Sequence, residues 1–254
     1  MADVIDYKLY GDDMQIVEIE LDPGEAVRAE AGAMLYMENG IEMSTSTGGG
    51  LLKGFKRALT GESFFITDFI HQGSGKSKVA FSAPYPGKII PLDLSEYGGH
   101  FICQKDAFLC AAKGTEISIE FTKKFGAGLF GGEGFILQHL SGDGMAFIHV
   151  GGTVITKTLA QGETIRIDTG CIAGFERSVG YNIQMMKGFK NALFGGEGLF
   201  IATLTGPGRI FLQSLPLSRL ANRIAAGLNH NKGEQKGIAG MGGSLLGSLL
   251  SGDN

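Results

Sequence analysis

Short apolar runs separated by glycine-containing turns recur along this chain and predict antiparallel β-strands. Three runs rich in β-forming residues each precede a Gly-x-Gly turn, and a second apolar run follows each turn; the turns are at 73–75, 142–144 and 206–208. The runs before the turns are 64–67, 135–138 and 199–202, and those after them are 79–81, 145–148 and 209–212. Two such runs around a short glycine turn are typical of a β-hairpin. We therefore predict three hairpins.

A second pattern lies upstream of the predicted hairpins. Residues 24–34 and 162–172 match in step at an offset of 138, sharing Gly, Glu, a β-branched residue, Arg, an acid and a second Gly. The middle stretch, 98–108, is more diverged and has Asp106 where the others have glycine. Apolar and polar residues alternate after the Gly-Glu pairs, which indicates a turn leading into a half-buried strand.

A third motif, Phe with Leu four residues later and then Gly-Glu, also occurs three times. It covers residues 55–62, 125–133 and 189–197. Several motifs recurring together indicate that one structural unit was copied three times. We place the copies at about 16–92, 93–158 and 159–216, within one domain of residues 1–226.

These patterns predict a mostly β fold. Three units of short antiparallel strands bury their apolar faces either around a shared pseudo-threefold axis or in a stacked row. We expect the first, in a compact all-β domain. Apolar residues at helical spacing near the end predict a short helix after the third copy: Leu217, Leu220, Ile224 and Leu228. Residues 227–254 are rich in glycine and predict a flexible tail.

Composition narrows the class of protein. The chain has 254 residues, of which 42 are Gly, and a net charge of −4, which gives no overall attraction to nucleic acid. Its three cysteines form no C-x-x-C pair, so a reducing compartment is the simpler interpretation. The N-terminus lacks the apolar stretch of a signal peptide, and no apolar run approaches a membrane span of about 20 residues. We expect a cytoplasmic protein.

Two segments resemble nucleotide-binding motifs, but their aligned copies argue against both. Residues 126–131 fit G-x-G-x-x-G, yet the other copies have Lys and Ala in place of its first two glycines, and a strand is predicted to follow. Residues 73–77 end like a phosphate-binding loop, but Ile70 stands where that motif requires glycine. We interpret both as structural turns, and 73–77 as a hairpin tip.

Candidate catalytic residues are sparse. The five histidines lack the spacing of metal-binding motifs, and we interpret them as surface or core residues: His71, His100, His139, His149 and His230. No G-x-S-x-G elbow is present, and neither Cys103, Cys110 nor Cys171 has the context of a nucleophile. We predict no catalytic residue, no metal site and no cofactor.

The copies share acidic and basic residues near the Phe motif. The acidic ones are Glu62, Glu133 and Glu197. Three converging carboxylates need a cation, so we favour structural roles for them. The basic ones are Lys53, Lys56, Arg57, Lys123, Lys124, Lys187 and Lys190. On a short helix the first three lie off the apolar stripe of Leu52, Phe55 and Leu59, as in segments that contact anionic membranes. A solvated face is the simpler alternative, and anionic-surface binding is our hypothesis.

The triplicated motif, with 86–94 and the Ser-Leu-Pro ending at 214–216, resembles the altered-inheritance-of-mitochondria, or mitochondrial biogenesis, family over residues 1–226. The resemblance implies the fold of the tryptophan RNA-binding attenuation protein-like class, in which antiparallel β-sheets pack as a sandwich or a double-stranded β-helix. It also implies a non-enzymatic role. It does not imply binding of RNA or tryptophan, because we find no matching site.

We therefore predict a non-catalytic scaffold or interaction protein, a homo-oligomer that contacts anionic membranes through its basic loops and binds no nucleic acid. A small-ligand- or metal-binding protein, or an enzyme, with a pocket between copies is the alternative.

Overall fold

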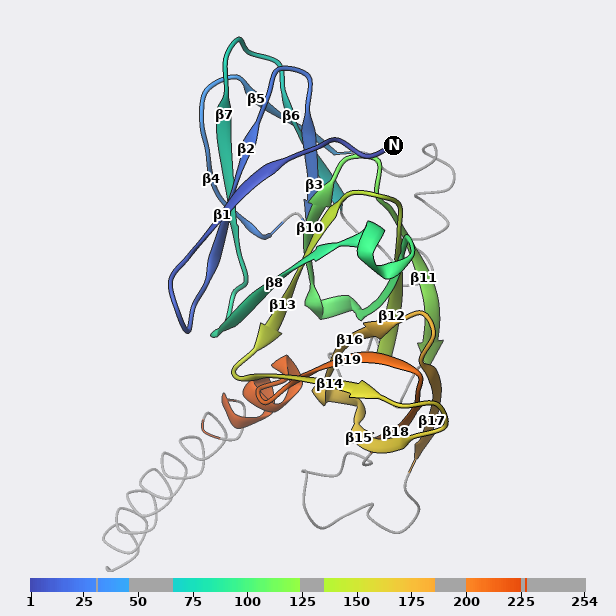
Figure 1. Ribbon diagram of the computed structural model, residues 1–254. Coiled ribbons are helices and arrows are strands. Elements are labelled where there is room, and N and C mark those ends of the chain that lie inside the picture. Colours follow the sequence, from blue (N-terminus) through green and yellow to red (C-terminus); the bar gives the residue numbers. More distant parts are fainter. Residues whose placement is uncertain (31, 46–65, 124–134, 186–199, 225–226, 228–254) are drawn as a thin grey trace, which may run out of the picture. The chain divides into compact units, whose positions relative to one another are not determined.

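The computed structural model describes residues 1–30, 32–45, 66–123, 135–185, 200–224 and 227 (Figure 1). Almost all of the described elements are strands, joined antiparallel into sheets. This confirms the predicted mostly β fold of packed antiparallel sheets. The three copies of the Phe and Gly-Glu motif and the glycine-rich tail lie outside the described residues.

The described strands form four sheets, which we number in the order in which they first occur. In order of pairing, the first sheet contains β1 (Asp6–Tyr10), β2 (Ile16–Leu21), β7 (Ser77–Ser82) and β4 (Met34–Met37). The second contains β5 (Ile41–Thr45), β6 (Ile66–His71), β3 (Ala26–Glu30), β10 (Phe108–Ala112), β13 (Met145–Gly151) and β8 (Gly87–Asp93).

The third sheet contains β11 (Glu116–Lys123), β12 (Phe135–Ser141), β9 (His100–Gln104), β16 (Ile172–Glu176), β19 (Gly208–Gln213) and β14 (Val154–Leu159). The fourth contains β15 (Thr164–Asp168), β18 (Phe200–Thr205) and β17 (Gly180–Met185). Short 3-10 helices are η1 (Leu94–Tyr97), η2 (Lys105–Ala107) and η4 (Thr169–Cys171).

The same pairing pattern occurs in three successive stretches of the chain. In the first stretch β2 and β4 flank β7, and β3 and β5 flank β6; β8 to β13 and β14 to β19 repeat this arrangement. A register irregularity falls at the same place in each stretch, between Met34 and Tyr36, between Phe108 and Cys110, and between Ile172 and Gly174. The boundaries near 93 and 159 stay predictions, because strand pairing does not define where a copied unit begins.

The three predicted hairpins are wrong. The strands on either side of each Gly-x-Gly turn do form, but they belong to different sheets: β6 lies in the second sheet and β7 in the first. In the same way β12 and β13 are divided between the third and second sheets, and β18 and β19 between the fourth and third. The turn therefore carries the chain from one sheet to the next, which an apolar run, turn and apolar run do not reveal.

Three apolar clusters lie between successive sheets. The first contains Val17 and Phe81 of the first sheet with Val27 and Phe147 of the second. Another joins the second and third sheets through residues such as Ile148 and Phe101, and the last joins the third and fourth through residues such as Phe175 and Leu204. The second and third sheets are therefore covered on both faces, whereas the described residues cover one face of the first and fourth.

The stretches are joined in a row by strand pairing. β3 of the first stretch pairs with β10 of the second (Figure 1). In the same way β9 of the second pairs with β16 of the third. A symmetrical ring would also pair β15 of the third stretch with β4 of the first. Among the described strands, β15 and β4 are each at the end of a sheet. The described strands therefore join the three stretches in an open row and not in a ring closed by strand pairing.

The segment after β19 includes the predicted short helix. Residues 217–224 are helical, and Leu217 and Ile224 of its predicted apolar face are exposed. Residues 1–217 form one compact unit, to which the described residues from Ser218 onward do not belong. No helix within the described ranges is long and apolar enough to cross a membrane.

Candidate interaction surface

The residues singled out in the sequence lie almost entirely beyond the described part of the chain. Lys123 is the last residue of β11, and its side chain is not described. The remaining members of both sets fall in 46–65, 124–134 and 186–199: Lys53, Lys56, Arg57, Lys124, Lys187, Lys190, Glu62, Glu133 and Glu197. Binding of an anionic surface and the role of the glutamates stay predictions.

The outer face of the first sheet carries the most connected polar cluster among the described residues. Along β2, Val17, Ile19 and Leu21 enter the core, so the intervening Glu18 and Glu20 lie on the opposite face. This alternation follows from the two-residue period of a strand. It places carboxylates on a sheet face that also receives lysines from β7 and its preceding turn.

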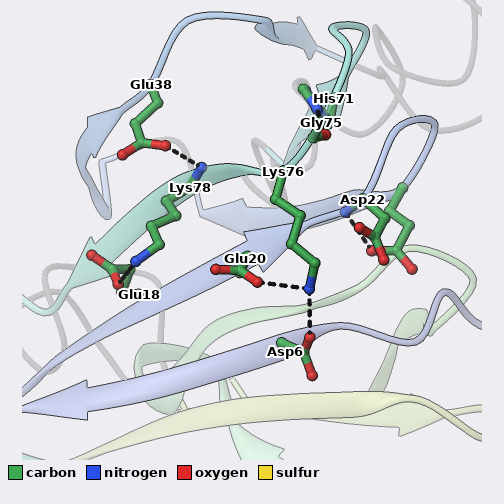
Figure 2. Close-up of polar contacts among 10 residues, drawn as sticks. Asp6, Glu18, Glu20, Asp22, Glu38, His71, Gly75, Lys76 and Lys78 are labelled. Carbon is green, nitrogen blue, oxygen red and sulfur yellow. Dashed lines mark hydrogen bonds and ion pairs between the residues drawn. The ribbon is translucent and has the colours of Figure 1, made fainter.

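Glu18 links all four strands of the first sheet. Its carboxylate accepts hydrogen bonds from the hydroxyl of Tyr36 on β4 and from the hydroxyl of Tyr10 on β1 at 3.1 Å. It also accepts one from Nζ of Lys78 on β7 at 2.9 Å (Figure 2). The hydrogen bond from Tyr36, followed by that from Lys78, lowers the pKa of Glu18, although burial opposes the shift. The same bond raises the pKa of Tyr36 to about 12.

Tyr36 reaches Glu18 across β7. The strand position opposite both residues is Ala80, whose small side chain leaves room for a tyrosine ring between β4 and β2. We therefore call Tyr10, Glu18, Tyr36 and Lys78 the Glu18 cluster. It holds the strands of this sheet together on the side away from the core.

Lys76 forms a second polar link on the same face. Its Nζ lies 2.7 Å from Glu20 and 3.2 Å from Asp6, and these hydrogen bonds raise the pKa of Lys76 (Figure 2). Lys76 belongs to the segment that resembles a phosphate-binding loop, but β7 follows it rather than a helix. The segment is therefore a turn followed by a strand, as predicted, but it is not the tip of a hairpin, because β6 and β7 lie in different sheets. Its lysine is paired with carboxylates.

Replacing Glu18 by glutamine is expected to lower the free energy of unfolding by about 1–2 kcal/mol at pH 7, because hydrogen bonds to a charged acceptor become weaker. The pKa of Glu18 is lower in the folded protein, so its stabilisation is complete above the unfolded-state pKa of about 4.3 and is lost as the pH falls through the folded-state pKa. Urea unfolding at several pH values should show the two proteins converging in acid.

Glu20→Gln is the matched control for this measurement. Glu20 is on the same strand and face, but its side chain is 31% exposed and pairs with a lysine that is itself half-exposed. Exposed pairs contribute little, so its substitution should have a smaller effect. Equal losses at the two positions, or a Glu18→Gln difference that does not change with pH, would contradict the role of the Glu18 cluster.

The edge strand β4 of the first sheet is more exposed than the corresponding strands β10 and β16. The register irregularities align Leu35 of β4 with Leu109 of β10 and with Ala173 of β16. Leu35 is 51% exposed, whereas Leu109 is 3% and Ala173 is 0% exposed. Two positions later, Met37 is 40% exposed, and its counterparts Ala111 and Phe175 are fully buried. β4 therefore presents apolar side chains to solvent beside a backbone edge that pairs with none of the described strands.

Comparison with known proteins identifies the family. A family model described as Mitochondrial biogenesis AIM24 matches residues 7–215. The chain belongs to this family. An uncharacterised protein of Streptococcus pyogenes serotype M6 is 31% identical over 217 residues, covering 82% of this chain and 85% of that protein. A crystal structure of a Streptococcus pyogenes protein has a TM-score of 0.72 at 26% identity and covers 87% of this chain and 99% of the other.

The AIM24 family match confirms the resemblance seen in the triplicated motif, and the solved structure has a similar fold. The sequence did not indicate the Glu18 cluster, because its members come from four strands. The available signal was the alternation of carboxylates with core residues along 17–21. Such alternation identifies a polar face but not the strands that meet there.

In this AIM24 family chain the sequence also did not indicate that two histidines lie side by side, because they belong to different strands. His100 on β9 and His139 on β12 stack with ring centres 5.0 Å apart, and Nδ1 of the first lies 3.1 Å from Nε2 of the second. Burial, followed by the charge of His100, lowers the pKa of His139. Within the described residues, no three His, Cys, Asp or Glu side chains form a group able to hold a metal. The pair thus lacks a third ligand there.

Proposed function

We propose that this AIM24 family protein is a non-catalytic scaffold that binds other polypeptide chains through an open sheet edge. The exposed apolar strand β4 supports this function. The corresponding strands β10 and β16 are buried, and each is paired with a strand on both sides. An edge strand offers unpaired N–H and C=O groups, and natural proteins usually protect such edges. A partner strand would gain backbone hydrogen bonds and cover the apolar side chains.

The Glu18 cluster supports the same role through rigidity. Tyr36 belongs both to the exposed edge and to the hydrogen-bonded cluster, so β4 is held in its extended form before a partner arrives. Ordering of a binding segment is one of the costs of association, and a preformed strand avoids it. Binding at β4 would then be favoured over binding by a loop of similar composition.

Native mass spectrometry of the purified full chain tests this function. We expect a defined assembly of polypeptide chains without bound small molecules or metal. A single chain carrying a stoichiometric ligand or metal would overturn the scaffold and favour the alternative, a ligand-binding protein with a pocket between copies. The proposed location is the cytoplasm, in keeping with the buried thiols of Cys103 and Cys110, whose pKa values are raised by burial.

Contact with anionic membranes is part of the proposal and rests on the sequence. Basic residues recur beside the shared Phe in each copy, and Lys53, Lys56 and Arg57 lie off the apolar stripe of their segment. Replacing these three by alanine should reduce flotation with liposomes that contain anionic lipid, and it should not change behaviour with neutral liposomes. Unchanged flotation on anionic liposomes would remove membrane contact from the proposal.

A further inference from the structure

The two junctions between successive stretches have the same register. Across the first junction, β3 and β10 place three pairs of residues opposite each other: Ala29 and Cys110, Arg28 and Ala111, and Val27 and Ala112. Across the second, β9 and β16 do the same with Cys103 and Gly174, Ile102 and Phe175, and Phe101 and Glu176. Aligned by their own sheet partners, these are the same three positions in each stretch.

Each junction pairs a strand of one set, β3 or β9, with a strand of a second set, β10 or β16. In each set the third member has no such partner among the described strands. β15 corresponds to β3 and β9, because it pairs with β18 as they pair with β6 and β12. β4 corresponds to β10 and β16. Both β15 and β4 are at the end of a sheet in the described part of the chain. The row of stretches thus begins with an open β4 and ends with an open β15.

We propose that β15 of one copy pairs antiparallel with β4 of a second copy, in the register of the two internal junctions. Ile167 then lies opposite Tyr36, Arg166 opposite Met37, and Ile165 opposite Glu38 of the second copy. The fourth sheet of one copy and the first sheet of the next become one continuous sheet. This inference rests on the proposed scaffold function and names its partner as a second copy of the same chain.

Burial supports β15 as the donor strand. The middle residue of the junction is half-buried at Arg28 and fully buried at Ile102, but the corresponding Arg166 is exposed. The next position toward the N-terminus is fully buried at Val27 and Phe101 and only half-buried at Ile165. β15 and β4 therefore expose side chains at positions that are more buried in the corresponding strands. The proposed pairing would bring these exposed positions of the two copies together.

Arg28 shows how an arginine at this position can fasten a junction. Its Nη1 donates to the backbone carbonyl of Thr115 at 2.9 Å, which reaches past β10 into the second stretch. Arg166 occupies the corresponding place on β15 and has no hydrogen bond or ion pair with any residue in the described ranges. The corresponding backbone position in the second copy is Ile41, three residues beyond Glu38. Arg166 is thus available to make the same contact between copies.

For the other end strands, the corresponding strands do not show which strand would pair with them. The remaining end strands are β1, β5, β8, β11, β14 and β17. β5, β11 and β17 correspond to one another and are end strands in all three stretches, as are β8 and β14. β2, their counterpart, is covered by the additional strand β1. β4 and β15 are therefore the described end strands whose counterparts are internal in the other stretches.

Contact between β4 and β15 is heterologous, because it joins two different surfaces. Such contacts close into rings when the rotation between copies permits and otherwise continue as filaments. Association therefore continues until every β4 and every β15 is paired in a closed ring, or it continues as a filament. A symmetrical dimer formed by two β4 strands would instead leave both β15 strands at sheet ends.

Charge substitutions at one predicted pair test the register. Met37→Lys places lysine opposite Arg166, and Arg166→Glu places a carboxylate opposite the apolar Met37 and removes the contact with the carbonyl of Ile41. Each single variant should therefore associate at least about tenfold more weakly than the unmodified chain, equivalent to about 1.4 kcal/mol. An equimolar mixture of the two variants should assemble like the unmodified chain, because the introduced glutamate then faces the introduced lysine at one interface and Arg166 faces Met37 at the next. The double variant should assemble again.

Sedimentation velocity over a wide concentration range, starting from the 26.8 kDa chain mass, gives the readout. Met43→Lys is the matched control: Met43 is a 47% exposed methionine on the end strand β5, and its substitution should leave assembly unchanged. Circular dichroism should show all variants folded. Single variants that assemble like the unmodified chain would overturn the β4–β15 pairing while leaving the scaffold function standing. An unmodified chain that stays single at all concentrations would overturn the pairing as well.

Disulfide trapping tests the register directly. Residues opposite each other in antiparallel strands have Cβ atoms about 4.5–5.5 Å apart, close to the separation that a disulfide spans. The variant with Glu38→Cys and Ile165→Cys should form covalent ladders on oxidation. The variant with Glu42→Cys on β5 and Ile165→Cys should not, and equal ladders in both would contradict the proposed pairing.

Discussion

Replacing Phe101 by alanine is expected to lower the free energy of unfolding by about 3–5 kcal/mol, because it removes a buried aromatic ring from between two sheets. Phe101 is fully buried in the cluster that joins the second and third sheets. Its ring meets those of Tyr97 and Phe211 edge to face, with centres 5.3 and 5.7 Å away. The neighbouring sheets on both sides restrict collapse of the resulting cavity.

Phe101→Leu is the control, since it retains most of the apolar volume and should cost clearly less than the alanine substitution. Chemical unfolding followed by circular dichroism and by tyrosine fluorescence measures both changes. A loss below about 1 kcal/mol for Phe101→Ala would show that the cluster is not packed as described.

Replacing Gly174 by alanine is expected to lower the free energy of unfolding by about 1–3 kcal/mol through steric overlap at the junction of β9 and β16. An added Cβ would lie 2.6 Å from Cε1 of Phe101 and 2.8 Å from the carbonyl oxygen of Ile102. The Phe101 ring is enclosed by the core, and the carbonyl belongs to the paired strand β9. Neither atom can move without separating the second stretch from the third.

Gly180→Ala provides the matched control for this substitution. Gly180 also lies within a strand, β17, but the atom nearest to an added Cβ is 3.8 Å away, an ordinary contact distance. Its substitution should change the free energy of unfolding by less than about 0.5 kcal/mol. Thermal unfolding of both variants compares them, and equal stability would show that β9 and β16 are less closely apposed than the structure has them.

Local patterns predicted the strands and several turns well. Gly24 and Gly162, recognised as matching turns that lead into strands, both have left-handed backbone conformations, with φ of 91° and 75°, and β3 and β15 begin two residues after them. The diverged middle copy has the same feature at Gly98, with φ of 64°. These features depend on a few neighbouring residues, so the sequence alone is sufficient to predict them.

The hairpin prediction failed because strand pairing is not local. β6 is followed closely by β7, yet β6 pairs with β3 and β5, and β7 pairs with β2 and β4. The apolar alternation of a strand specifies which face is buried but not which strand lies beside it. A glycine turn that changes sheets has the same local composition as a turn that closes a hairpin.

For this protein the sequence by itself determined the β class, the strand segments, the recurrence of motifs and membership of the mitochondrial biogenesis AIM24 family. Only the tertiary structure decided that Glu18 accepts hydrogen bonds from three other strands and that β3–β10 and β9–β16 share one register. It also decided that β4 and β15 are end strands among the described strands. The physical reason is range: side-chain alternation and backbone torsions depend on adjacent residues, whereas pairing and burial depend on residues far apart in the chain.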